Sequence, residues 1–311
     1  MVVWSFETMY KYNLAIQFED IVERYPQHPA FWFNEHEIYS YTELNQRANR
    51  LARLLLQHGL TAGDVVCISG SKSVHTFSLM LACLKIGVVY SIFDPDSPLE
   101  RLGKIFLTCH PRLAAADGDL LQKMDDSLEK LSISAINTDE LVSHMESFDD
   151  TNLPVSRTIT GTNPAYIMFT SGSTGVPKGA VMTHANVLNL LQWSRETYGI
   201  TLADILTNVN PLYFDNSVFD FYSSVFNGAC LVPFSKQETR NPQRGAAMHR
   251  PQPSFREAWE SFRRRAGALR HLVAVGLGTM AFSMQDVLLE PYGGQVLAMT
   301  VASTTRLTAT L

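Results

Sequence analysis

The chain has 311 residues, of which 46% are hydrophobic and 18% are charged, and its formal net charge at pH 7 is −5. This composition excludes a largely disordered chain and leaves room for one large domain or two ordinary ones. The small negative charge gives no electrostatic reason to expect nucleic acid or an anionic membrane as a partner. No apolar stretch approaches the roughly 18 residues of a membrane span, and no signal peptide is visible, so we expect a cytoplasmic protein.

The cysteines are few and widely spaced, and they form no C-x-x-C pair; they are Cys67, Cys83, Cys109 and Cys230. Most of them lie in apolar surroundings, as small buried side chains do. We therefore expect free thiols in a reducing compartment, not a disulfide framework or a zinc site.

The first predicted helix covers residues 42–58. Its apolar residues recur at helical spacing on one face, and they are Leu44, Ala48, Leu51 and Leu55. Thr42 is placed to cap the start of this helix, and Gly59 is placed to end it.

A strand–helix–strand unit follows. The apolar runs 64–69 and 88–93 predict strands, and 74–86 predicts a helix that ends at Gly87. Such a unit implies two parallel strands joined by a right-handed crossover.

The rest of the chain continues to alternate between helices and strands up to residue 232. Further strands are predicted at 112–116, 165–169, 179–182, 205–209 and 229–232. Further helices are predicted at 138–145, 186–198 and 216–226, and residues 149–162 form a polar connector. This alternation predicts an α/β fold of layered, mostly parallel sheets.

A loop rich in glycine and hydroxyl groups follows the predicted strand 165–169, and residues 170–179 read T-S-G-S-T-G-V-P-K-G. Glycines let the backbone approach a ligand and point successive N–H groups at it, while hydroxyls donate and Lys178 adds positive charge. The loop is not a Walker A loop, because Pro177 precedes the lysine and Gly179 follows it. The residues expected to hold a polyphosphate are Thr170, Ser171, Gly172, Ser173, Thr174, Gly175 and Lys178.

The use of basic residues changes near residue 240. Residues 1–239 contain eight Arg and eight Lys, whereas residues 240–311 contain nine Arg and no Lys. Lysine codons are AT-rich and most arginine codons are GC-rich. We therefore expect a domain over residues 1–240 and an unassigned tail over 241–311 that is frameshifted or chimeric; an ordinary Arg-rich surface region is the alternative.

The loop T-S-G-S-T-G-x-P-K-G resembles the phosphate loop of the adenylate-forming, or AMP-binding, superfamily. The resemblance extends over roughly residues 10–240. Residues 39–44 (Y-S-Y-T-E-L) and 84–95 (L-K-I-G-V-V-Y-S-I-F-D-P) are similar to two further family segments, with departures at 91–93. Residues 183–186 (T-H-A-N) resemble the family's x-H-x-N helix start. There His184 is either a packing or capping residue or a contact to phosphate or the acyl group.

Residues 210–219 (N-P-L-Y-F-D-N-S-V-F) are similar to the F-D-x-S-V-W motif of amino-acid-activating members, such as nonribosomal peptide adenylation domains and D-alanine–carrier-protein ligases. The resemblance implies that Asp215 binds the substrate's α-ammonium group. It also implies that Asn216 and Phe219 line the side-chain pocket and that Phe214 lies near the nucleotide channel. We expect the Asp215 carboxylate to be partly buried in apolar surroundings, where it favours a cationic partner. The alternative is that Asp215 only caps the helix 216–226.

The resemblance implies ATP-dependent activation of a carboxylate, specifically an amino acid, with Mg²⁺ and with a carrier protein's phosphopantetheine as acyl acceptor. The family's later Y-G-P-T-E and T-G-D motifs and its C-terminal lysine are not found. We therefore expect an incomplete N-terminal body without the C-terminal lid domain, and assign no catalytic residue. Two alternatives remain: a non-catalytic remnant or nucleotide-binding module, and an acyl- or aryl-CoA ligase.

Overall fold

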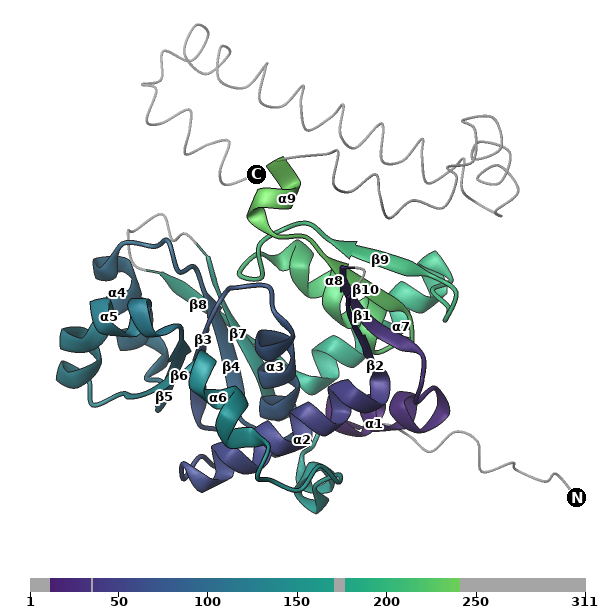
Figure 1. The fold of residues 1–311 in the computed structure, drawn as a ribbon, viewed down its shortest axis with the longest axis horizontal. Coiled ribbons are helices and arrows are strands. Elements are labelled where there is room, and N and C mark those ends of the chain that lie inside the picture. Colours follow the sequence, from purple (N-terminus) through teal and green to yellow (C-terminus); the bar gives the residue numbers. More distant parts are fainter. Residues whose placement is uncertain (1–11, 35, 171–176, 241–311) are drawn as a thin grey trace, which may run out of the picture. The chain divides into compact units, whose positions relative to one another are not determined.

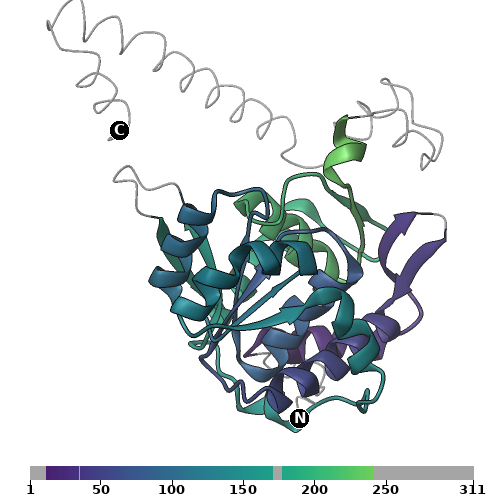
Figure 2. The same ribbon diagram turned by 60° about the vertical axis from the view of Figure 1, so that its left-hand side comes forward.

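The computed structural model describes residues 12–34, 36–170 and 177–240 (Figures 1 and 2). The chain divides into two compact units, residues 1–242 and 243–311, and every described residue belongs to the first unit. In that unit, helices surround and separate two β-sheets. Among the described helices, none combines the length and the apolar character needed to cross a membrane.

The described strands are β1 Pro29–Asn34, β2 Glu37–Ser40, β3 Val65–Ser69, β4 Val89–Phe93, β5 Leu113–Ala116, β6 Ser134–Asn137, β7 Pro164–Thr170, β8 Lys178–Thr183, β9 Ile205–Asn208 and β10 Cys230–Pro233. The described helices are α1 Leu14–Arg24, α2 Tyr41–Gln57, α3 Val74–Ile86, α4 Leu99–Cys109, α5 Gly118–Lys130, α6 Thr138–Met145, α7 His184–Tyr198, α8 Asp215–Val225 and α9 Lys236–Arg240, together with a 3₁₀ helix η1 at Pro154–Thr158.

The larger sheet has six strands in the order β6-β5-β3-β4-β7-β8. Its strands run parallel except β8, which returns antiparallel to β7. The predicted strand–helix–strand unit is confirmed as β3–α3–β4, in which Val65 lies opposite Val89 of the parallel partner. Its strands β3, β4 and β5 are buried on both faces, which explains why they read as continuous apolar runs in the sequence.

The two faces of this sheet belong to different cores because side chains alternate along a strand. Val66 and Ile68 of β3 belong to the main core together with residues of α2 and α3. Cys67, between them, faces a second core with Phe106 of α4 and Met124 of α5. Figures 1 and 2 both show α4 and α5 beside each other at this sheet.

The smaller sheet has the order β2-β1-β10-β9 and joins segments far apart in the sequence. β1 pairs antiparallel with β2 and parallel with β10, where Phe31 lies opposite Leu231. β10 pairs in parallel with β9.

Helices α3 and α8 connect the two sheets through aromatic side chains. The ring of Phe77 in α3 lies with its centroid 4.6 Å from that of Phe31 in β1 and 5.5 Å from that of Phe221 in α8. From α8, the hydroxyl of Tyr222 hydrogen-bonds that of Tyr90 in β4 at 2.7 Å. Apart from His75, every residue of α3 is buried, so this helix forms the centre of the main core.

The start of α2 corrects one prediction. The capping residue is Ser40, not Thr42, and the helix begins at Tyr41. The Ser40 hydroxyl accepts from the Glu43 N–H at 3.2 Å, and the Glu43 carboxylate accepts from the Ser40 N–H at 2.7 Å. This reciprocal pair is a capping box, which satisfies two backbone donors instead of one.

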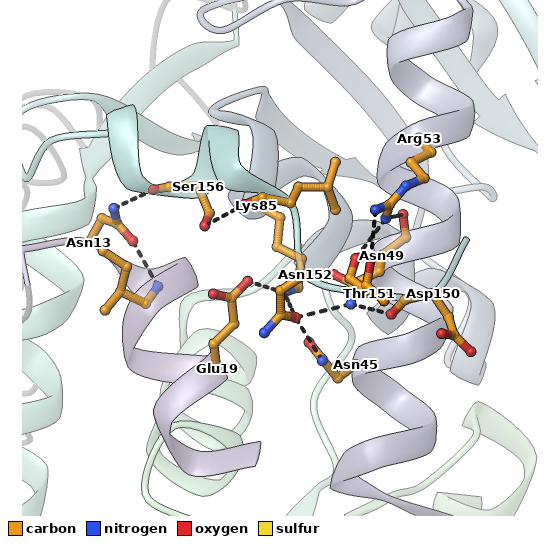
Figure 3. A network of polar contacts seen from close by, with 12 residues as sticks. Asn13, Glu19, Asn45, Asn49, Arg53, Lys85, Asp150, Thr151, Asn152 and Ser156 are labelled. Atoms are coloured by element: carbon orange, nitrogen blue, oxygen red, sulfur yellow. Dashed lines mark hydrogen bonds and ion pairs between the residues drawn. The ribbon is translucent and has the colours of Figure 1, made fainter. Parts of the chain in front are cut away.

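A buried polar network holds the predicted connector 149–162 against three helices (Figure 3). The side chain of Lys85 in α3 is 1% exposed, and its ammonium group pairs with Glu19 of α1. Burial lowers the pKa of Lys85, and the charge of Glu19 opposes this shift. The Oδ1 atom of Asn152 accepts from Lys85, from Asn45 at 2.9 Å and from Asn49 at 3.0 Å. Asn152 therefore anchors the connector to α2 and α3, next to the buried charge pair of Lys85 and Glu19.

Candidate functional site

The predicted phosphate loop lies at the end of the β7–β8 hairpin. Thr170 ends β7 and Lys178 begins β8, and the two residues face each other across the antiparallel pair. The Thr170 hydroxyl is 3.5 Å from the Lys178 carbonyl oxygen, and both side chains are exposed. The other predicted phosphate-binding residues lie outside the described residues; they are Ser171, Gly172, Ser173, Thr174 and Gly175.

The predicted substrate motif opens helix α8. Asp215 is the first helical residue, and the cap position belongs to Phe214, which makes no side-chain capping bond. The expectation that Asp215 is partly buried is wrong, because Asp215 is exposed, as are Phe214 and Asn216. The alternative that Asp215 is the N-cap is also wrong. Its Oδ1 accepts from the adjacent Asn216 N–H at 2.8 Å, and its charge lies at the positive end of the helix.

Strand β7 lies close to both predicted motifs. Tyr166 precedes Thr170 by four residues on β7, so the two side chains lie on the same face of the strand. Burial raises the pKa of Tyr166 to about 12, and the negative charge of Asp215 contributes to that rise. Asp215 is therefore within electrostatic reach of the strand that leads into the phosphate loop.

A small cavity of about 20 Å³ lies beneath the start of α8, with room for a water-sized group. Its walls come from α3, β4, β7, the segment before α8 and the first turn of α8, and they are Met80, Tyr90, Ile92, Tyr166, Ile167, Met168, Leu212, Ser217 and Val218. Neither Asn216 nor Phe219 lines this cavity. The ring of Phe219 instead packs against Trp193 and Tyr198 of α7, with centroids 6.1 and 5.5 Å apart.

Lys72 joins the ends of three strands at this side of the fold. It follows β3, and its ammonium group donates to the carbonyl oxygens of Asn208 at 2.7 Å, Val209 at 3.0 Å and Phe234 at 2.9 Å. Burial lowers the pKa of Lys72 to about 8, and the charge of Asp220 opposes that shift. Lys72 thereby fixes the carboxyl end of β3 to those of β9 and β10.

Asn208 at the end of β9 holds the first turns of α8. Its side chain is fully buried and donates to the Ser217 hydroxyl at 2.6 Å and to the Asp220 carboxylate at 3.2 Å. Burial raises the pKa of Asp220, while the Asn208 bond and the charge of Lys72 oppose this. Lys72, Asn208 and Asp220 are not among the residues predicted from the sequence. Asp220 directly follows the F-D-N-S-V-F segment at residues 214–219, and this position is a sequence signal that could have marked it as part of the site.

The segment before α8 docks on the carboxyl ends of β3 and β4. The ring of Tyr213 lies so close to Gly70 that a Cβ at that position would be 3.0 Å from it and 2.9 Å from the Phe93 carbonyl oxygen. Burial raises the pKa of Tyr213, and the Asp94 carboxylate, to which its hydroxyl is hydrogen-bonded, raises it further. In parallel α/β sheets, ligands bind outside these strand ends, so the predicted site occupies the expected edge.

His184 is a packing residue. It is fully buried, and its Nδ1 accepts from the backbone N–H of Leu14 at 3.1 Å. Burial lowers the pKa of His184 to about 4, so the ring is neutral at physiological pH. Helix α7 is capped by the neighbouring Thr183 in a capping box with Asn186. These contacts support the packing interpretation over a contact to phosphate.

Within residues 12–34, 36–170 and 177–240, no group of three or more His, Cys, Asp or Glu side chains could hold a metal ion.

Comparison with known proteins adds an independent line of evidence. The AMP-binding enzyme family model matches residues 18–272. Surfactin synthase subunit 2 of Bacillus subtilis (strain 168) is 31% identical over 273 residues, which cover 83% of this chain and 7% of that protein. Gramicidin S synthase 2 of Brevibacillus brevis is 33% identical over 235 residues, which cover 75% of this chain and 5% of that protein. This chain therefore spans a small part of the length of these relatives.

Solved structures show the same fold. The N-terminal subdomain of Klebsiella oxytoca NpsA, in complex with 3-hydroxyanthranilyl-AMSN, superposes with a TM-score of 0.62 at 25% identity. The similarity covers 72% of this chain and 54% of that one. The family match covers most of the chain and the relatives exceed 30% identity. The chain belongs to the AMP-binding enzyme family.

Proposed function

We propose that this chain is the N-terminal body of an adenylating ligase that activates an amino acid with ATP and passes it to a carrier thiol. The observation that carries the proposal is the placement of Asp215. Its carboxylate is exposed at the start of α8, within electrostatic reach of β7, and β7 leads directly into the phosphate hairpin. The carboxylate proposed to bind a cation is thus on α8, and the hairpin proposed to bind phosphate is on the nearby strand β7.

In this proposal the β- and γ-phosphates of ATP bind at the hairpin. Thr170 and Lys178 supply a hydroxyl and a positive charge at its base, and the intervening loop residues supply further hydroxyl and N–H donors. Mg²⁺ is expected to bind with the phosphates of ATP. No described cluster of side chains could hold the ion alone, so we assign no step to it.

Asp215 is proposed to bind the α-ammonium group of the amino acid. An exposed carboxylate is accessible to a ligand that arrives from solvent, and water exclusion by the bound ligand would strengthen the charge pair. Asn208, through Ser217 and Asp220, positions the helix turn that carries Asp215. Asn216, Phe219 and Phe214 remain predicted pocket and channel residues.

The proposed reaction proceeds in two steps. A carboxylate oxygen of the substrate attacks the α-phosphorus of ATP, a P–O bond forms, and pyrophosphate leaves with the electrons of the broken bond. A thiol then attacks the acyl carbon and AMP leaves. The described residues bind and orient the reactants, which is the main contribution of a protein to phosphoryl-type transfer.

A carrier protein's phosphopantetheine is the proposed acceptor. The relatives include a dimodular nonribosomal peptide synthase of Bacillus subtilis (strain 168), and a fold neighbour is described as an artificially fused Adenylation-PCP di-domain from Klebsiella oxytoca. We propose that the adenylation body covers residues 1–240 and that residues 241–311 form a frameshifted or chimeric tail. The change in Arg and Lys usage supports this division, although the family match continues to residue 272. Sequencing the transcript and its genomic locus across codon 240 tests it.

ATP–pyrophosphate exchange tests the proposed activity, measured on a repaired full-length protein in which residues 1–240 are continued by the family's missing motifs and lid domain. A panel of amino acids, aryl acids and fatty acids should show exchange dependent on an amino acid. Exchange that depends only on an aryl or fatty acid would contradict amino-acid activation and favour an acyl- or aryl-CoA ligase. ATP binding without any exchange would leave a nucleotide-binding module.

A further inference from the structure

Two cysteine sulfur atoms meet in the second core although 42 positions separate them in the sequence. The Sγ atoms of Cys67 and Cys109 are 3.7 Å apart. Cys67 lies in the middle of β3 and is fully buried, whereas Cys109 is the last residue of α4 and is partly exposed. The two thiols therefore differ in access to solvent while touching each other.

The surroundings of the pair are apolar. Cys67 packs in the second core with Phe93, Leu102 and Phe106, and Cys109 packs against the edge of this core. The hydrogen bond between the two sulfurs raises the pKa of Cys67, and burial raises it further. The same hydrogen bond lowers the pKa of Cys109. The more accessible sulfur is therefore the better nucleophile, since the thiolate is the reactive form.

We propose that Cys67 and Cys109 form a redox modification site, in which the two thiols are converted reversibly to an intramolecular disulfide by exchange with a low-molecular-weight disulfide. A disulfide has a sulfur–sulfur distance of about 2.05 Å, so the two atoms must approach by about 1.7 Å. Cys109 is the last residue of α4, next to the left-handed residue His110, whereas Cys67 lies within a central strand, so the approach is proposed to occur at this helix end. The proposal is independent of the proposed function.

The exchange occurs in two balanced steps. The Cys109 thiolate attacks one sulfur of the small disulfide, and a mixed disulfide forms at Cys109 while one small thiolate leaves. The Cys67 sulfur then attacks Cys109 Sγ, loses its proton, and displaces the second small thiol. The two protein thiols are oxidised and the small disulfide is reduced to two thiols. A small thiol reverses both steps, so the site needs no permanently oxidising compartment.

Peptide mass spectrometry tests the proposal directly. The folded chain is incubated with oxidised glutathione, and the remaining thiols are alkylated in denaturant before digestion. We expect a linked peptide pair containing Cys67 and Cys109, lighter than the two reduced peptides by two hydrogen atoms, and its disappearance after reduced glutathione is added. Alkylated Cys67 and Cys109 at every oxidant concentration, or a glutathione adduct at Cys109 that never resolves, would overturn the proposal.

Single variants separate the two steps. Cys67→Ser should keep a persistent glutathione adduct on Cys109, because the resolving sulfur is missing. Cys109→Ser should leave Cys67 reduced under the same conditions. Cys83→Ser is the matched control, since Cys83 is a buried free thiol outside this pair, and it should form the Cys67–Cys109 link like the parent chain. If Cys67→Ser does not fold, Cys109→Ser and Cys83→Ser still decide the outcome, because a disulfide between Cys67 and another cysteine in Cys109→Ser, or a missing Cys67–Cys109 link in Cys83→Ser, would contradict the pairing.

Discussion

The ammonium group of Lys72 donates a 2.7 Å hydrogen bond to the backbone carbonyl of Asn208, and this bond joins the turn after β3 to the end of β9. Two strands from different sheets are thus fixed at the edge where the predicted site lies. Replacing Lys72 with Met removes the donor shared by three carbonyl groups. The hydrogen bonds to Asn208 and Phe234 are partly buried, so these two carbonyl groups lose a partner away from solvent. We expect a loss of about 2 kcal/mol in the free energy of unfolding, measured by urea denaturation.

The control for this variant is Lys236→Met. Lys236 forms an ion pair with Asp96, but both side chains are more than half exposed. Exposed pairs contribute little to stability, so this variant should unfold like the parent chain. Equal losses for the two variants would contradict the joining role of Lys72.

The neutral, buried ring of His184 predicts a pH dependence of stability. Its pKa is about 4 in the folded chain and near 6.5 when unfolded, so the unfolded state binds more protons between these values. Stability is therefore lost as pH falls from about 6.5 towards 4, by at most about 3 kcal/mol for this group.

Urea unfolding at several pH values measures this effect. His184→Asn should flatten the slope of stability against pH in this window, although the variant is less stable overall. His36→Asn, in the exposed β1–β2 turn, should keep the parent's slope. A slope that is unchanged in His184→Asn would show that other groups cause it.

The hydroxyl groups of Tyr90 in β4 and Tyr222 in α8 form a hydrogen bond with an oxygen–oxygen distance of 2.7 Å. Tyr222→Phe leaves the buried hydroxyl of Tyr90 without its partner, which should cost about 1–2 kcal/mol of unfolding free energy. The double variant Tyr90→Phe/Tyr222→Phe should recover most of this loss, because no polar group is then left unpaired. A double-mutant cycle from thermal or urea unfolding measures the coupling, and purely additive losses would exclude it.

Gly70 allows the Tyr213 ring to lie against the end of β3. In Gly70→Ala the new methyl group would meet the Phe93 carbonyl at 2.9 Å, and backbone cannot yield as a flexible side chain can. We expect a loss of about 1–3 kcal/mol in unfolding free energy. Gly103→Ala in α4 is the matched control, because its methyl group meets no atom within 4 Å and alanine favours a helix. That variant should be at least as stable as the parent.

Local patterns in the sequence were sufficient for the elements around the site. The helix over 74–86 and its end at Gly87 agree with α3, because an apolar run bounded by Ser73 and glycine is a local signal. The capping box of Ser40 and Glu43 is also a local signal, an S-x-x-E pattern, and it outweighs Thr42 as the predicted cap. Helices α4 and α5 were missed although Leu102, Ile105 and Phe106 have helical spacing.

Features that depend on distant contacts could not be predicted. β1 is a short strand, and its pairing with β10 depends on Phe31 meeting Leu231, which no local pattern encodes. The same holds for Lys72, which follows an ordinary strand and acquires its role only where β9 and β10 end beside it. The exposure of Asp215 was likewise misjudged, because flanking apolar residues do not reveal where a helix begins.

Asp215 is the group proposed to bind the ammonium of the substrate. The most direct test of this role is equilibrium binding of a non-reactive aminoacyl-sulfamoyl-adenosine analogue to the parent chain, Asp215→Asn, and the control Asp125→Asn on the exposed face of α5. A charged hydrogen bond of about 1.5–3 kcal/mol predicts that Asp215→Asn weakens binding roughly 10- to 100-fold. Asp125→Asn should bind like the parent, and a matched analogue without the amino group should bind the parent and Asp215→Asn equally. Equal binding of the aminoacyl analogue to the parent and to Asp215→Asn would contradict the proposed role.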